Sequence, residues 1–181
     1  MKFETTLDYA KHRIDEILGE ADYTKSFVAL DIDATVLTLD THNRVHPVEL
    51  GLYIQEAATR RNLQVVYITA RLDTPDARRQ TYRDLNQVGI TNAELFLRPS
   101  DIKTWEGIST FKADQRRFCE EKYKKYCILN AGDQWTDLIP SLTTNRWDRL
   151  SYKYDPQKDF VLFRDLSYWD SRERWALKLI E

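Results

Sequence analysis

Short apolar runs alternate with helix-like segments along most of this chain. Patterns of a buried strand occur at 26–32, 63–69, 94–98 and 126–133, and a segment with helical spacing or helix-capping residues follows each one. Parallel strands need a crossover connection of a dozen or more residues, which a helix provides. The alternation therefore predicts an α/β fold in which helices cover both faces of a mostly parallel sheet.

Four longer helices are expected, at 6–21, 46–61, 74–88 and about 111–124. Proline suits the first turn of a helix, so Pro47 and Pro75 are placed at helix starts. Gly89 is placed at a helix end because glycine accepts the left-handed conformation found there. The same pattern puts Lys112 at the beginning of the last of these helices. A short fifth helix is expected to end at Pro140.

The length of 181 residues suits one domain with a sizeable core. We expect a single domain with a lead-in helix at 6–21, a motif-bearing core at 26–140 and a C-terminal strand-and-helix tail at 159–181. Within the tail, 159–165 is a candidate fifth strand. We expect the aromatic tail to pack on the core or to form a contact in a homo-oligomer. Stacking on nucleobases is a third alternative.

Composition limits the class of protein. The net charge of −2 and the pI near 6.0 give no sign of nucleic-acid binding, although they leave a local basic face open. Cys119 and Cys127 lack the spacing of a metal site, and we expect free thiols in a reducing compartment. The N-terminal segment carries charges throughout, and no apolar run approaches a membrane span. We therefore expect a cytoplasmic protein without a signal peptide or a membrane contact.

Polar residues stand where the predicted strands end. Asp31 and Asp33 follow the first strand, Thr69 ends the second, and Asp133 and Asp137 follow the fourth. In an open parallel sheet, the carboxyl ends of the strands share one edge, where ligands bind. We therefore expect these side chains to converge there, joined by a lysine from the helix that follows the third strand.

This set of side chains suits phosphoryl transfer. A carboxylate can attack phosphorus, and a neighbouring carboxyl group can exchange protons with the leaving group and with water. Mg²⁺ bound by carboxylates would relieve the repulsion between Asp31 and Asp33, which point to the same side. Lys112 would add a positive charge beside the phosphoryl oxygens; Lys103 and Arg116 compete with it for this role.

Four segments that hold these residues resemble the motifs of the haloacid dehalogenase (HAD) phosphohydrolase superfamily. DIDATV (31–36) is similar to the first motif, VVYITAR (65–71) to the second, FKADQRR (111–117) to the third and GDQWTD (132–137) to the fourth. They occur in the order of the family. The pieces TAR, FKADQRR and AGDQWTDL are most similar to the subfamily IIIB acid phosphatases, which include class B enzymes and plant vegetative storage proteins.

The resemblance implies a Rossmann-like three-layer sandwich that is capless or minimally capped, because little beyond one helix separates the first two motifs. It also implies a Mg²⁺-dependent phosphomonoester hydrolase that works through an aspartyl-phosphate. Asp31 would be the nucleophile and a metal ligand. Asp33 would act as the general acid and base, and its backbone carbonyl would bind the metal.

The resemblance further assigns the residues that bind phosphate and metal. Thr69, the amide of Ala70 and Lys112 would hold the phosphoryl oxygens. Asp133 would be a direct metal ligand, and Asp137 a supporting acid near the metal. The chain departs from the family in having alanine at position 70, where TGR is common, and at position 34, where glycine or glutamate is common.

Several alternatives stay open at the level of sequence. The leading hypothesis for the substrate is a small phosphorylated metabolite or a nucleotide. A nucleic-acid end, as in a 3′-phosphatase, is the second, motivated by the arginines at positions 78, 79 and 83. A non-catalytic binding or storage protein is the third, and an acceptor other than water would make the enzyme a phosphotransferase. Arg71 either contacts the substrate or pairs with Asp73.

Overall fold

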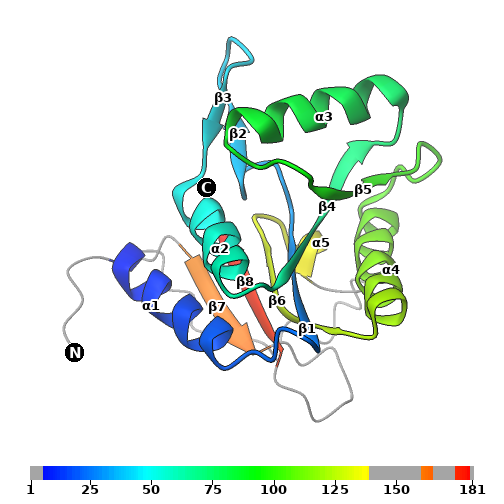
Figure 1. Cartoon of the computed structure of the whole chain (residues 1–181). Helices are drawn as coiled ribbons and strands as arrows, with labels where there is room; N and C mark the ends of the chain where they lie inside the picture. The colour runs from blue at the N-terminus through cyan, green and yellow to red at the C-terminus, as the bar shows by residue number, and fades with distance from the viewer. Residues whose placement is uncertain (1–5, 139–159, 165–173, 180–181) are drawn as a thin grey trace.

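The computed structural model describes residues 6–138, 160–164 and 174–179, and its centre is a six-stranded sheet (Figure 1). The strand order is β5-β4-β1-β6-β8-β7. The strands are β1 (Ser26–Leu30), β4 (Gln64–Leu72), β5 (Glu94–Arg98), β6 (Tyr126–Gly132), β7 (Phe160–Arg164) and β8 (Trp175–Leu179). Five neighbouring strands are parallel and β7 is antiparallel to β8. The predicted α/β class and mostly parallel sheet are confirmed.

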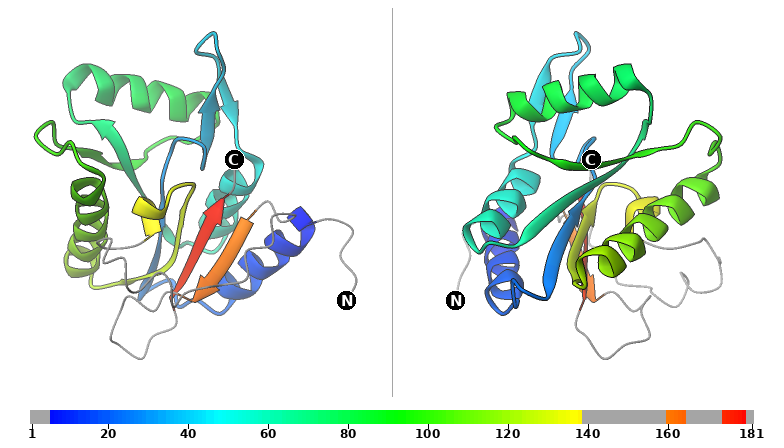
Figure 2. Two further views of the ribbon diagram at one scale, coloured as in Figure 1. Left: turned by 180° about the vertical axis from the view of Figure 1, so that it is seen from behind. Right: turned by 45° about the vertical axis from the view of Figure 1, so that its right-hand side comes forward.

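Helices cover both faces of this sheet (Figure 2). They are α1 (Thr6–Gly19), α2 (Glu49–Arg60), α3 (Pro75–Gln87), α4 (Trp105–Tyr123) and the short α5 (Trp135–Leu138). Strand β1 shows why two layers of helices are needed, because all five of its residues are buried. Val28 and Leu30 belong to the apolar cluster that includes α1 and α2, whereas Phe27 and Ala29 belong to the cluster under α4. Successive side chains of a strand point to opposite faces, so a strand buried on both sides is apolar throughout.

Residues at both ends of helix α3 mark where it starts and stops, as predicted. The Thr74 hydroxyl accepts a hydrogen bond from the Ala77 amide at 3.2 Å, and Pro75 is the first helical residue. Gly89 follows the helix with a φ of 83°, a conformation that glycine adopts without strain. These local signals are sufficient to mark both ends of the helix.

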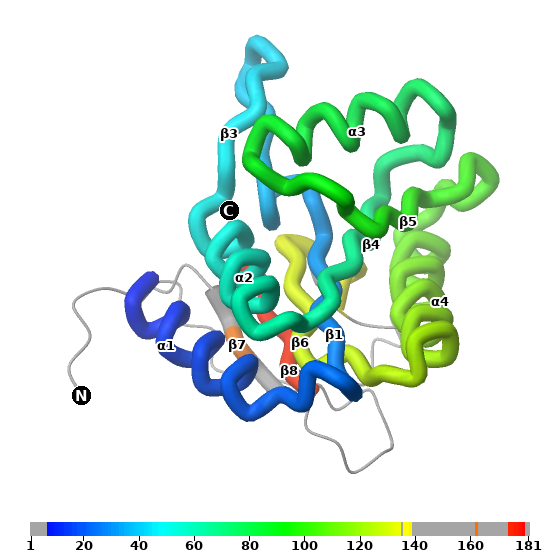
Figure 3. The backbone as a smooth tube through the Cα atoms, in the orientation of Figure 1, coloured from blue at the N-terminus to red at the C-terminus, as the bar shows by residue number. Residues whose placement is uncertain are grey.

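A hairpin replaces the predicted helix start at Pro47. Strands β2 (Leu37–Leu39) and β3 (Val45–Pro47) pair antiparallel, with Leu37 opposite Pro47, and α2 begins only at Glu49. The fixed φ of proline suits an edge strand as well as a first helical turn. Pairing with β2 therefore decides the conformation of Pro47. The hairpin and α3 lie at the end of the molecule toward which β1 and β4 run (Figure 3).

Helix α4 begins earlier than the sequence indicates. The Thr104 hydroxyl accepts a hydrogen bond from the Gly107 amide at 3.1 Å, which caps a helix that starts at Trp105. Lys112 therefore lies two turns inside the helix and does not open it. The first two turns of α4 show only weak apolar periodicity, so the pattern of apolar residues does not reveal this start. The N-cap residue Thr104 was the signal in the sequence that could have marked it.

The C-terminal tail supplies two strands. The candidate strand at 159–165 is found as β7, but it is antiparallel and lies at the edge of the sheet. The fifth parallel strand is β8, which pairs with β6 over residues that we expected to lie in a mixed strand-and-helix tail. The rest of the tail and Pro140 lie outside the described residues.

Two further predictions concern composition. Cys119 and Cys127 are both buried and are not joined in a disulfide, as expected, and burial raises the pKa of Cys119 to about 12. Among the described residues, no helix combines the length and the hydrophobicity that crossing a bilayer requires.

Candidate active site

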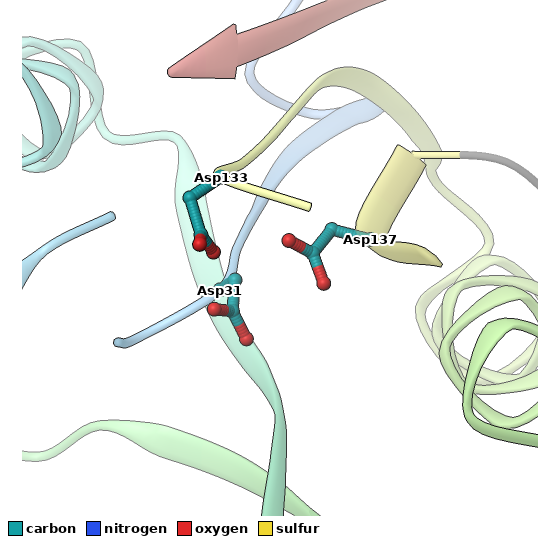
Figure 4. Close-up of side chains that lie close together, drawn as sticks. All are labelled: Asp31, Asp133 and Asp137. Carbon is teal, nitrogen blue, oxygen red and sulfur yellow. The ribbon is translucent and has the colours of Figure 1, made fainter. Parts of the chain in front are cut away.

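Three aspartates meet at the carboxyl edge of the sheet (Figure 4). Asp31 follows β1, Asp133 follows β6, and Asp137 comes from α5. Strands β1 and β6 are parallel neighbours, and the Asp31 amide continues their pairing by donating to the Ala131 carbonyl at 2.9 Å. One carboxylate oxygen from each aspartate lies within 4.8 Å of the other two, and all three residues are buried. The predicted convergence of acids is thus found for these three.

Lys112 reaches this cluster from the neighbouring helix α4. Its ammonium group donates to Asp31 Oδ1 at 2.7 Å and to Asp137 Oδ1, and its side chain is 3% exposed. One turn later, Arg116 is also buried and donates to the Asp137 backbone carbonyl at 2.5 Å. Lys103, the other candidate, is exposed. The structure therefore brings Lys112 into contact with Asp31.

Among the described residues, the cluster gathers three buried carboxylates and one buried ammonium group. Lys112 contacts two of these carboxylates, those of Asp31 and Asp137, and burial raises the pKa of Asp31 to about 8 although the charge of Lys112 opposes this shift. Burial lowers the pKa of Lys112, but the two aspartates that it contacts outweigh burial and raise it. Excess buried negative charge on hard oxygen ligands is the environment that a divalent cation stabilises. The donor set therefore fits Mg²⁺.

Gly132 permits the close approach of Asp137. A Cβ atom built at position 132 would lie 2.3 Å from Asp137 Cβ, far inside van der Waals contact. The Asp137 carboxylate is held on both oxygens, since Oδ2 accepts from the Gln134 amide at 2.8 Å while Oδ1 accepts from Lys112. Asp137 is therefore suited to a supporting role beside a metal, because its oxygens already accept hydrogen bonds.

Asp33 is not a member of the cluster of three buried acids, although its charge contributes to raising the pKa of Asp31. It occupies the turn after β1, next to Ala34 with a φ of 53°, and its side chain is 51% exposed. Arg71 binds both of its carboxylate oxygens, from Nε at 2.9 Å and from a terminal nitrogen at 2.7 Å. The alternative that Arg71 pairs with Asp73 is wrong, because Asp73 pairs with Arg78 at 2.7 Å instead.

Thr69 and Ala70 lie inside β4, which runs on to Leu72, so the prediction that Thr69 ends this strand is wrong. Leu30 pairs with Tyr67, so Thr69 is two residues further along the neighbouring strand. The pairing of β4 with β5 becomes irregular between Thr69 and Leu72. The Thr69 hydroxyl is buried and accepts from the Arg71 amide at 3.2 Å. These residues therefore border the same edge as Asp31.

Sequence reasoning missed several contacts of the site. Lys178 of β8 donates to the Asp133 carbonyl at 2.8 Å, and Asn130 donates to the Asp137 carbonyl at 2.9 Å. Asp84 of α3 binds Arg71. Lys178 is distant in sequence from the group it contacts, and no local pattern marks it. The helical spacing of Asp84 on the buried side of α3 was the only available signal.

A comparison with protein families gives a match over residues 40–155, well over half of the chain. The matching family is described as the HAD superfamily, subfamily IIIB (acid phosphatase). The match includes the segments of Thr69, Lys112, Asp133 and Asp137 and begins after Asp33. No curated protein matches the chain. The chain therefore belongs to subfamily IIIB of the HAD superfamily, a family of acid phosphatases.

Proposed function

We propose that this chain is a Mg²⁺-dependent phosphomonoester hydrolase that uses Asp31 as its nucleophile and acts on a small phosphorylated metabolite or a nucleotide. The observation that carries the proposal is the buried cluster of Asp31, Asp133 and Asp137, which contacts a buried ammonium group at the carboxyl edge of the sheet. Family membership supports hydrolysis of a phosphomonoester, and the cluster supports the metal.

Asp31, Asp133 and the backbone carbonyl of Asp33 would hold Mg²⁺, with Asp137 beside them. When bound, the ion neutralises negative charge between the phosphoryl group and the nucleophile. Lys112 contributes a second positive charge, and its contact with Asp31 at 2.7 Å orients the nucleophile. Both effects lower the repulsion that otherwise keeps a carboxylate away from an anionic substrate.

In the first step, a carboxylate oxygen of Asp31 forms a bond to phosphorus while the bond from phosphorus to the leaving oxygen breaks. A protonated Asp33 donates its proton to that oxygen, so the product leaves as a neutral alcohol. The Thr69 hydroxyl, the Ala70 amide and Lys112 would bind the phosphoryl oxygens as negative charge is redistributed over them.

In the second step, a water oxygen attacks phosphorus and the bond to Asp31 breaks. Asp33, now a carboxylate, accepts the proton of the water and returns to its protonated form. Inorganic phosphate leaves and Asp31 is restored. The exposure of Asp33 supports this role, because half of its side chain is open to solvent while Asp31 is buried.

A nucleic-acid substrate gains little support from the described residues. Two of the arginines on α3 that motivate it pair with acids, Arg78 with Asp73 and Arg79 with Asp76. These pairs reduce the positive charge available for phosphate contacts. We therefore retain the small substrate as the proposal and include oligonucleotides only as test compounds.

The test is release of inorganic phosphate from a panel of nucleotides, sugar phosphates and 3′- or 5′-phosphorylated oligonucleotides, with Mg²⁺ and with EDTA. We expect release that requires Mg²⁺ and that Asp31→Asn abolishes. Asp114→Asn is the matched control, because Asp114 is an exposed acid of α4 that pairs with Arg117. Release that persists in EDTA and in Asp31→Asn would refute the proposal.

A further inference from the structure

Arg71 connects the turn of Asp33 to helix α3. One side of its guanidinium group binds both oxygens of Asp33, and a terminal nitrogen on the other side donates to Asp84 Oδ2 at 2.7 Å. The same nitrogen lies 3.3 Å from the Thr81 hydroxyl. The guanidinium group is planar and presents its donors in a fixed fork, so holding one side of it sets the direction of the other.

Asp84 is a buried anchor for this arginine. Its side chain is only 3% exposed, and its second oxygen accepts from the Gln80 amide group at 2.6 Å. A charged carboxylate is costly to bury without a partner, and Arg71 is the cation that compensates Asp84. Asp84 contacts neither the three-aspartate cluster nor Lys112. Among the described residues, the hydrogen bonds of its carboxylate go to Gln80 and Arg71, so its interaction with the site passes through Arg71.

Asp33 without this support would be poorly oriented. Half of its side chain is exposed, so solvent alone would leave the carboxyl group free to rotate. The Arg71 amide also donates to the Thr69 hydroxyl, which links the arginine to the predicted phosphate-binding residues.

We propose that Asp84 is a positioning residue that acts through Arg71 to hold Asp33 in the orientation needed for proton transfer to the leaving group. The inference rests on the proposed role of Asp33 as general acid. It differs from a direct role of Arg71 in substrate binding, because an anchor that acts on Asp33 affects the chemical step and leaves the affinity for phosphate unchanged.

The test compares two substrates whose leaving groups differ in their need for a proton. p-Nitrophenyl phosphate releases a weakly basic phenolate, whereas glycerol phosphate releases a strongly basic alkoxide unless it is protonated. We expect Asp84→Asn to lower kcat/KM for glycerol phosphate by about tenfold to hundredfold, within the range that general acid catalysis contributes. For p-nitrophenyl phosphate we expect a change below about threefold, and KM unchanged for both.

Two further variants keep the test decisive. Arg71→Lys retains the charge but cannot bind both oxygens of Asp33, so it should show the same dependence on the leaving group. In an Asp33→Asn background, Asp84→Asn should cause no additional loss, because the group that it positions is absent. Asp76→Asn is the matched control, since Asp76 also pairs with an arginine on α3 but is 91% exposed.

Equal losses for both substrates, a raised KM, or an additional loss in the Asp33→Asn background would each overturn the inference. Thermal unfolding confirms that each variant is folded, and Arg71→Lys carries the test if Asp84→Asn does not fold. Failure of the proposed function looks different: wild type would then release no phosphate in a metal-dependent manner, or Asp31→Asn would remain active.

Discussion

Substituting Gly132 by alanine tests how tightly the fourth motif is built. The added Cβ atom would lie 2.3 Å from Asp137 Cβ and 2.4 Å from Asp137 Oδ2. The φ of Gly132 is not positive, so backbone strain adds nothing to this clash. Asp137 cannot easily rotate away, because Lys112 and the Gln134 amide hold its carboxylate and Asn130 holds its backbone carbonyl.

The magnitude follows from these distances. Ordinary van der Waals contact begins near 3.4 Å, so α5 or the end of β6 must move by about 1 Å. Overpacking of this kind costs about 1–3 kcal/mol in the free energy of unfolding. A displacement of about 1 Å in a catalytic constellation lowers activity by about a hundredfold. We therefore expect Gly132→Ala to reduce kcat/KM on the order of a hundredfold and to lower Tm by a few degrees.

The assay combines steady-state phosphate release at saturating Mg²⁺ with thermal unfolding followed by circular dichroism. Gly19→Ala is the matched control, because a Cβ atom at the end of α1 meets nothing within 4 Å. It should leave both kcat/KM and Tm close to wild type. A fully active Gly132→Ala with the wild-type Tm would refute the conclusion that this glycine is required for the approach of Asp137.

Two other predictions address electrostatics. Lys112→Met removes the buried ammonium group that contacts Asp31 and Asp137. In EDTA, this variant should therefore have a free energy of unfolding that is lower by about 3–5 kcal/mol. An unchanged midpoint of urea unfolding would contradict this. Hydrogen bonds from the Thr24 side chain, with a further one from Lys25, lower the pKa of Asp22 from 3.8 to about 2. Because this pKa is depressed, the stabilisation is present above pH 4 and is lost as the pH falls from about 4 to 2. Thr24→Val should raise the pKa of Asp22 toward 3.8, which an NMR titration would measure. The variant should be less stable than wild type above pH 4, and this difference in the free energy of unfolding should disappear at pH 2.

Local sequence was sufficient for the elements whose signals are local. The buried strands β1, β4, β5 and β6 follow from apolar runs, and the ends of α3 follow from Thr74, Pro75 and Gly89. It was insufficient where pairing decides the conformation. Pro47 is compatible with a helix start and with an edge strand, and its partner Leu37 settles the choice. Likewise, β8 is the fifth parallel strand because β6 offers an open edge beside it.

The same division holds for the active site. The sequence by itself determined which residues gather at the carboxyl edge, because Asp31 and Asp133 each follow a strand, Thr69 lies in the last part of one, and parallel strands end on one side of the sheet. Only the tertiary structure decided what these groups contact. Arg71 binds Asp33 and Asp84 across 38 and 13 positions of sequence, and not its near neighbour Asp73. Such partners are set by the packing of α3 against the sheet edge, a long-range arrangement that no periodicity of the chain records.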